Sequence, residues 1–79
     1  MWWFYKLEEK GVHFIIYRYS RENKLLDGQI LFDISTQNAS IMKPCAMDEN
    51  SKKAQAKAIE HFATIINREY PEECYVCCG

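Results

Sequence analysis

The strongest pattern of apolar positions lies in the first twenty residues, which hold two apolar stretches separated by a short polar segment. Residues 2–9 and 12–20 are rich in aromatic and β-branched side chains, and Glu9-Lys10-Gly11 lies between them. Because Gly11 can take positive φ, this pattern predicts a β-hairpin with a two-residue turn at Lys10-Gly11. Such a turn pairs Leu7 with Phe14, Tyr5 with Ile16 and Trp3 with Arg18. A change of one residue in the loop would exchange the two faces of the hairpin.

Further strands are predicted after the polar segment 21–24. Apolar and polar residues alternate over about residues 25–35, and Asp27-Gly28 within that stretch indicates a turn or a bulge. A short fourth strand is predicted over residues 40–43. It ends before Pro44, because proline cannot donate the hydrogen bond that a sheet interior requires.

Residues 50–70 form the one segment with a clear helical period. Ile59, Phe62 and Ile66 recur at the spacing of a helix face. Candidate N-cap residues, whose side-chain oxygens can accept from the free amides of the first turn, are Asp48, Asn50 and Ser51. Pro71 ends the helix, because the residue before a proline disfavours the helical backbone conformation.

A run of strands followed by a helix predicts an α+β fold. We expect an antiparallel three- to four-stranded meander sheet, followed by one C-terminal amphipathic helix packed on one sheet face. A chain of 79 residues fits one domain. Residues 1–70 are assigned to this α+β domain, and residues 71–79 to a cysteine-rich C-terminal tail.

The charge balance narrows the classes of function. Ten Lys and Arg residues against eleven Asp and Glu residues give a net charge of −1. This balance argues against a general polyanion binder, because neutralising phosphates needs a basic excess.

No apolar run reaches the length of about 18 residues that a membrane span needs. The N-terminal apolar stretch is too short for an export signal and lacks a basic segment, so we expect a cytoplasmic protein without a membrane partner.

The aromatic content is the unusual part of the composition. The chain has eleven Phe, Trp and Tyr residues, and seven of them lie in the first twenty positions. Both faces of the hairpin are therefore apolar, whereas one helix covers only one face, and exposed apolar patches often mark binding surfaces. The candidate interaction surface consists of Trp2, Phe4, Ile15, Tyr17 and Tyr19, or of their neighbours on the opposite face. The alternative is that edge tyrosines lie flat with their hydroxyls in water while the tail covers the rest.

Cysteines suggest a second, weaker hypothesis, a small zinc-binding domain. Cys74 and Cys77 form a C-x2-C pair, which can supply two corners of a zinc tetrahedron. A strong zinc signature needs a second pair, and none is present. The remaining candidate ligands are Cys78, Cys45 and His61. In a reducing compartment a disulfide framework is the weaker interpretation, and no cofactor is expected.

Enzymatic activity and nucleic-acid binding are both disfavoured by the sequence. It lacks the G-x-S-x-G, G-x-G-x-x-G and P-loop motifs, and so short a chain rarely builds a concave pocket of about 300 Å³. Lys52, Lys53 and Lys57 cluster near the helix start, which leaves a weak nucleic-acid binder as a further alternative.

The sequence therefore does not specify a biochemical activity. It predicts a small non-enzymatic interaction or regulatory domain that presents an aromatic sheet face to an unknown protein partner. Self-association as a homodimer is one form of this prediction.

Overall fold

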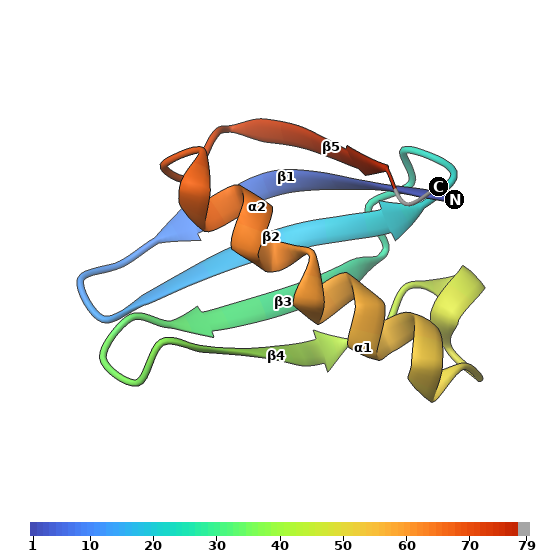
Figure 1. Ribbon diagram of the computed structural model, residues 1–79, viewed down its shortest axis with the longest axis horizontal. Helices are drawn as coiled ribbons and strands as arrows, with labels where there is room; N and C mark the ends of the chain where they lie inside the picture. The colour runs from blue at the N-terminus through green and yellow to red at the C-terminus, as the bar shows by residue number, and fades with distance from the viewer. Residues whose placement is uncertain (78–79) are drawn as a thin grey trace.

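The computed structural model describes residues 1–77 and has the α+β architecture that the sequence predicts (Figure 1). A five-stranded antiparallel sheet has the strand order β4-β3-β2-β1-β5, and helices α1 and α2 cross one face of it. The strands are β1 (Trp2–Lys10), β2 (Phe14–Arg21), β3 (Gly28–Asp33), β4 (Asn38–Lys43) and β5 (Glu73–Cys77). The connection from β4 to β5 contains η1 (Ala46–Asp48), α1 (Lys52–Glu60) and α2 (Phe62–Asn67).

The first hairpin turns at Val12-His13, two residues later than predicted. The amide of Gly11 donates to the carbonyl of Phe14 at 2.8 Å and closes the hairpin around these two residues. Tyr5 consequently lies opposite Tyr19, and the predicted cross-strand pairs are wrong.

This difference in register decides which aromatic residues share a face. Tyr5 pairs with Tyr19 instead of Ile16, a shift of three positions. Since side chains alternate along a strand, an odd shift moves every side chain of β2 to the other face relative to β1. The later turn alone would shift the pairing by four positions and leave the faces unchanged. The β-bulge between Leu7 and Glu9 reduces this shift to three for residues 3–7, so the bulge is what exchanges the faces.

The core lies between the sheet and the helices and absorbs most of the aromatic side chains. Its largest members are Trp3, Tyr5, Ile15, Tyr17, Tyr19, Ile30, Phe32, Phe62 and Ile65. Each buried tyrosine hydroxyl has a backbone partner. Tyr5 donates to the carbonyl of Ala58 at 2.9 Å, Tyr17 donates to the carbonyl of Pro71, and Tyr19 accepts from the amide of Cys45 at 3.1 Å. These bonds let large amphipathic rings fill the core without leaving a polar atom unpaired.

These tyrosines predict alkaline unfolding. Burial raises the pKa values of Tyr5, Tyr17 and Tyr19 above the ordinary tyrosine value of about 10. The folded state therefore favours the neutral phenols. Their contribution to stability is complete below about pH 10 and is lost as the pH rises further. In a pH titration, we expect tyrosinate absorbance and circular dichroism to change together above pH 10. Full ionisation of all five tyrosines in a chain that keeps its native circular dichroism would contradict this expectation.

The predicted helix begins as expected and is divided in the middle. Ser51 is the N-cap, and its hydroxyl accepts from the amide of Ala54 at 3.1 Å. His61 separates α1 from α2. The Tyr5 hydroxyl reaches the carbonyl of Ala58 one turn before this break, and a side chain inserted into the helical ladder is a known cause of a kink. No helix within residues 1–77 is long and apolar enough to cross a membrane.

Strand β5 makes the sheet one strand larger than the three to four strands predicted, and it lies in the segment assigned to the tail. Glu69 and Tyr70 both take positive φ and reverse the chain after α2. The amide of Leu7 then donates to the carbonyl of Glu72 at 2.8 Å, and β5 pairs antiparallel with β1. Burial alternates along β5, but residues 74–77 are all apolar, so the sequence signal for this strand is the short apolar run with Tyr75 and Val76 in it.

Candidate functional site

The sheet face opposite α1 and α2 is the candidate site, and we call it the uncovered face. Side chains of β1, β2, β3 and β5 alternate between this face and the core. Those on the uncovered face are Trp2, Phe4, Lys6, Phe14, Ile16, Arg18, Gln29, Leu31, Asp33, Glu73 and Tyr75, as the register of each strand pair shows. The face thus contains two apolar groups separated by a polar row.

Of the five residues predicted for the interaction surface, Trp2 and Phe4 lie on the uncovered face. Ile15, Tyr17 and Tyr19 lie in the core and are at most 1 % exposed, so their assignment to a surface is wrong. The physical reason is the register, which places β2 side chains of odd number on the same side as Trp3 and Tyr5.

The first apolar group is an aromatic cluster at the β1–β5 corner. The Tyr75 ring lies 4.7 Å from that of Phe4 and 5.8 Å from that of Trp2, measured between centroids. Lys24, from the β2–β3 connection, places its ammonium 5.4 Å from the ring centroids of both Phe4 and Tyr75. Phe4 is buried beneath this cover, whereas Tyr75 remains 46 % exposed. Much of the aromatic surface at this corner is therefore buried by contacts within the molecule.

The polar row crosses the middle of the face. The Glu8 carboxylate accepts from Arg18 Nε at 2.7 Å and from Gln29 Nε2 at 2.8 Å. The hydrogen bond from Arg18, followed by that from Gln29, holds the pKa of Glu8 below its ordinary value. Lys6 and Glu73 form a looser ion pair at 4.0 Å. Charges of both signs are thus paired within the face.

The second apolar group surrounds a shallow hollow near the first hairpin turn. The hollow has a volume of about 400 Å³ and is lined by His13, Phe14, Leu31, Asp33 and Ser35. Phe14 is 37 % exposed, and Val12 at the turn is 86 % exposed. Ile16 lies beside Leu31 and both are half-buried, so the exposed apolar area of this group comes mainly from Phe14 and Val12.

Asp33 and Ser35, two polar residues of this hollow, form hydrogen bonds within the turn after β3. Asp33 Oδ1 accepts from the Ser35 hydroxyl at 2.6 Å and from the amides of Ser35 and Thr36. The Ser35 hydroxyl bond, then the Thr36 amide, lowers the pKa of Asp33. A nucleophilic serine needs a base to accept its proton, as a histidine does in a triad. Within residues 1–77 Ser35 donates to Asp33 and not to His13, so this trio lacks that geometry.

The candidate zinc ligands do not come together. Cys74 is buried on the core side of β5, whereas Cys77, three residues later, is exposed on the opposite side. Cys45 is also buried, and burial raises the pKa of its thiol, which disfavours the thiolate that binds zinc. His61 lies edge-on to Trp3, with ring centroids 5.1 Å apart. Residues 1–77 contain no group of three or more potential metal ligands, and Cys78 lies outside the described residues.

The lysines proposed for nucleic-acid contact are separated from the exposed aromatic residues. Lys52, Lys53 and Lys57 lie on α1, which covers the other side of the sheet (Figure 1). Phe14 and Tyr75 face away from α1. The sequence-based combination of a lysine cluster with an aromatic platform is therefore not assembled on one surface.

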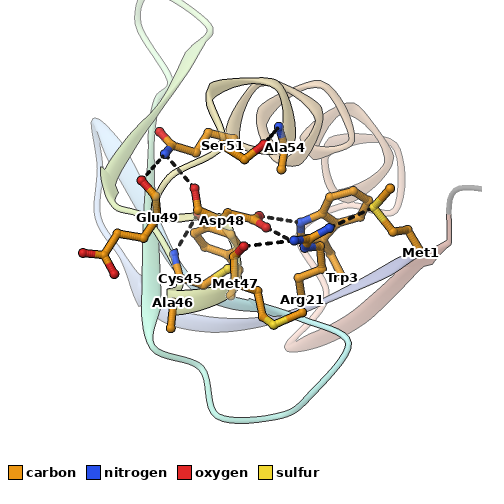
Figure 2. Close-up of polar contacts among 12 residues, drawn as sticks. Met1, Trp3, Arg21, Cys45, Ala46, Met47, Asp48, Glu49, Ser51 and Ala54 are labelled. Carbon is orange, nitrogen blue, oxygen red and sulfur yellow. Dashed lines mark hydrogen bonds and ion pairs between the residues drawn. The ribbon is translucent and has the colours of Figure 1, made fainter.

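A buried polar cluster near the start of α1 was not predicted. Figure 2 shows Arg21 from β2, Trp3 from β1 and Asp48 from η1 converging. Asp48 is fully buried, its Oδ1 lies 2.6 Å from Arg21 Nε, and its Oδ2 accepts from Trp3 Nε1 at 3.1 Å. Sequence patterns indicated Asp48 only as a helix-cap candidate, because no local pattern relates Trp3 to a residue 45 positions away.

Comparisons with protein-family models, with curated proteins and with solved structures find no match for this chain.

Proposed function

We propose that this protein is a small non-enzymatic interaction domain whose uncovered face pairs with the same face of a second copy. The observation that supports this most directly is the apolar group formed by exposed Phe14 and half-buried Ile16 and Leu31. It lies on a sheet face that neither α1 nor α2 covers (Figure 1). Exposed apolar area of this kind is typical of protein contact surfaces.

The charge distribution favours a second copy over a strongly charged partner. Four cationic side chains of this face, Lys6, Arg18, Lys24 and Lys43, are balanced by four acidic ones, Glu8, Glu9, Asp33 and Glu73. Two of the cations are already in ion pairs with acids of the same face. A balanced surface does not attract a polyanion, and it does not repel a copy of itself through net charge.

The size of the face predicts a weak dimer. Five strands spaced by about 4.8 Å, each about six residues long, span an area of about 480 Å². A stable interface buries about 800 Å² per partner. We therefore expect weak association, in the range typical of small transient interfaces.

Sedimentation velocity from about 10 µM to about 1 mM tests this proposal. Phe14→Lys should weaken the dimer at least tenfold, because it places an ammonium in the second apolar group. The monomer should tolerate this change, since position 14 lies opposite Asp33. A chain that stays monomeric up to about 1 mM would overturn the proposal.

Ile66→Lys is the matched control. Ile66 lies on α2 and is 37 % exposed, the same fraction as Phe14. The dimer should keep its affinity in this variant. Equal weakening by Ile66→Lys and Phe14→Lys would show that the uncovered face has no special part in association.

A further inference from the structure

We propose that a basic hollow beside α1 binds the phosphate group of a small molecule. We call it the basic hollow and define it by three cationic side chains, Arg21, Lys53 and Lys57. It lies at the start of α1, away from the uncovered face, so the proposal is independent of the dimer.

The hollow has the size and lining of a small anion site. Its volume is about 180 Å³, and its walls are formed by Met1, Arg21, Ser51, Lys53, Ala54 and Lys57. This lining contains three cationic residues and no acidic one. Lys53 and Lys57 lie one helical turn apart, so both side chains start from the same side of α1.

Arg21 is held in place before any ligand binds. Its Nε pairs with Asp48 at 2.6 Å, and its Nη2 donates to the carbonyl of Met47 at 2.9 Å (Figure 2). Its Nη1 donates to the Met1 sulfur at 3.1 Å. A thioether sulfur is a weak acceptor, whereas a phosphate oxygen is a strong one. An anion in the hollow would therefore give Nη1 a better partner while the other bonds of the guanidinium remain.

The two lysines reduce the stability of the empty fold. Like charges at positions i and i+4 repel, and Lys53, in the first turn of α1, also opposes the helix dipole, whereas Lys57 lies in the last turn. Within residues 1–77 neither Lys53 nor Lys57 has an ion pair, although Glu60 lies three positions after Lys57. A bound anion would offset the repulsion between Lys53 and Lys57.

The chemistry favours a phosphate group over other anions. The planar donors of an arginine match phosphate oxygens, and two lysines can neutralise the dianion of a phosphate monoester. The small volume suits one phosphate group with a short attached group. A nucleic-acid strand needs an extended basic track, and the chain has a net charge of −1.

Thermal unfolding in inorganic phosphate, at constant ionic strength, tests the site. At ten times its dissociation constant, phosphate should raise the melting temperature by about 6–10 °C. The double variant Lys53→Gln/Lys57→Gln should lose most of this increase, with at least tenfold weaker binding. Without phosphate, it should melt at the same temperature as the original chain or higher, because a repulsion has been removed.

Lys52→Gln is the matched control, since Lys52 is an exposed neighbour on α1 that does not line the hollow. It should keep the full response. Phosphate also stabilises folded proteins by exclusion from their surface, and that effect is equal in all three chains. An equal rise in the original chain and in Lys53→Gln/Lys57→Gln would therefore overturn the proposal.

A second titration follows backbone amide resonances of residues 51–57 with phosphate and with glycerol phosphate. Shifts concentrated in this segment support the site, and tighter binding of glycerol phosphate would identify a monoester as the preferred source. Shifts spread over the whole chain, or absent from this segment, would overturn it.

Discussion

Asp48→Ala is expected to lower the free energy of unfolding by about 3–5 kcal/mol. Asp48 is fully buried and is the ion-pair partner of Arg21, whose side chain is itself only 17 % exposed. Removing the carboxylate leaves that guanidinium without its partner charge and the Trp3 indole N–H without an acceptor. A domain of this length has a total stability of about 4–12 kcal/mol, so the loss is a large part of the whole.

Urea denaturation followed by tryptophan fluorescence measures this effect directly. Glu49→Ala is the control, because Glu49 is exposed and adjacent in sequence, and it should change stability by less than about 0.5 kcal/mol. Asp48→Asn should fall between the two variants, since an amide oxygen can still accept from Trp3. If Asp48→Ala and Glu49→Ala lost the same small amount, the buried cluster would contribute nothing to stability.

The second large effect is expected at Gly28, where an added methyl group has no space. A Cβ at this position would lie 2.5 Å from Tyr19 Cε1 and 2.7 Å from the amide nitrogen of Cys45. Tyr19 is fully buried and accepts a hydrogen bond from that same amide, so neither neighbour can move independently. Gly28→Ala should therefore destabilise the fold by about 3 kcal/mol through overpacking.

Gly11→Ala is the matched control for this prediction. Its added Cβ would lie 3.2 Å from both the ring and the carbonyl oxygen of Phe14, contacts longer than those at Gly28 and at the end of a hairpin where the exposed ring can shift. We expect a loss below about 1 kcal/mol, measured by the same urea denaturation. A comparable loss at both glycines would indicate that Gly28 matters only through strand propensity and not through its contact with Tyr19.

The local patterns predicted the type and place of most elements. The period of Ile59, Phe62 and Ile66 indicated the helix, and Ser51 is one of the three caps considered. The alternation after residue 24 indicated β3, and residues 40–43 lie within β4. These predictions succeeded because each depends on side-chain spacing within one element.

The residues of the candidate site were harder to predict from local sequence patterns. The surface prediction included Ile15, Tyr17 and Tyr19, which the true register buries. The turn at Val12-His13 contains no glycine. The prediction placed the turn two residues earlier, because Gly11 is the glycine in this segment. The exposed face of β2 therefore depended on the β-bulge between Leu7 and Glu9 as well as on the turn, and local propensity identifies neither.

The sequence by itself determined an α+β domain with more aromatic side chains than one helix can cover, because hydrophobic spacing and composition are local properties. Only the tertiary structure decided where those side chains lie. It placed Trp3, Tyr5, Tyr17 and Tyr19 together under the helices and joined Asp48 to Arg21. It also left Phe14, Ile16 and Leu31 on the uncovered face. Strand register and long-range ion pairs are set by the packing of the whole chain, since they join residues that no local pattern relates.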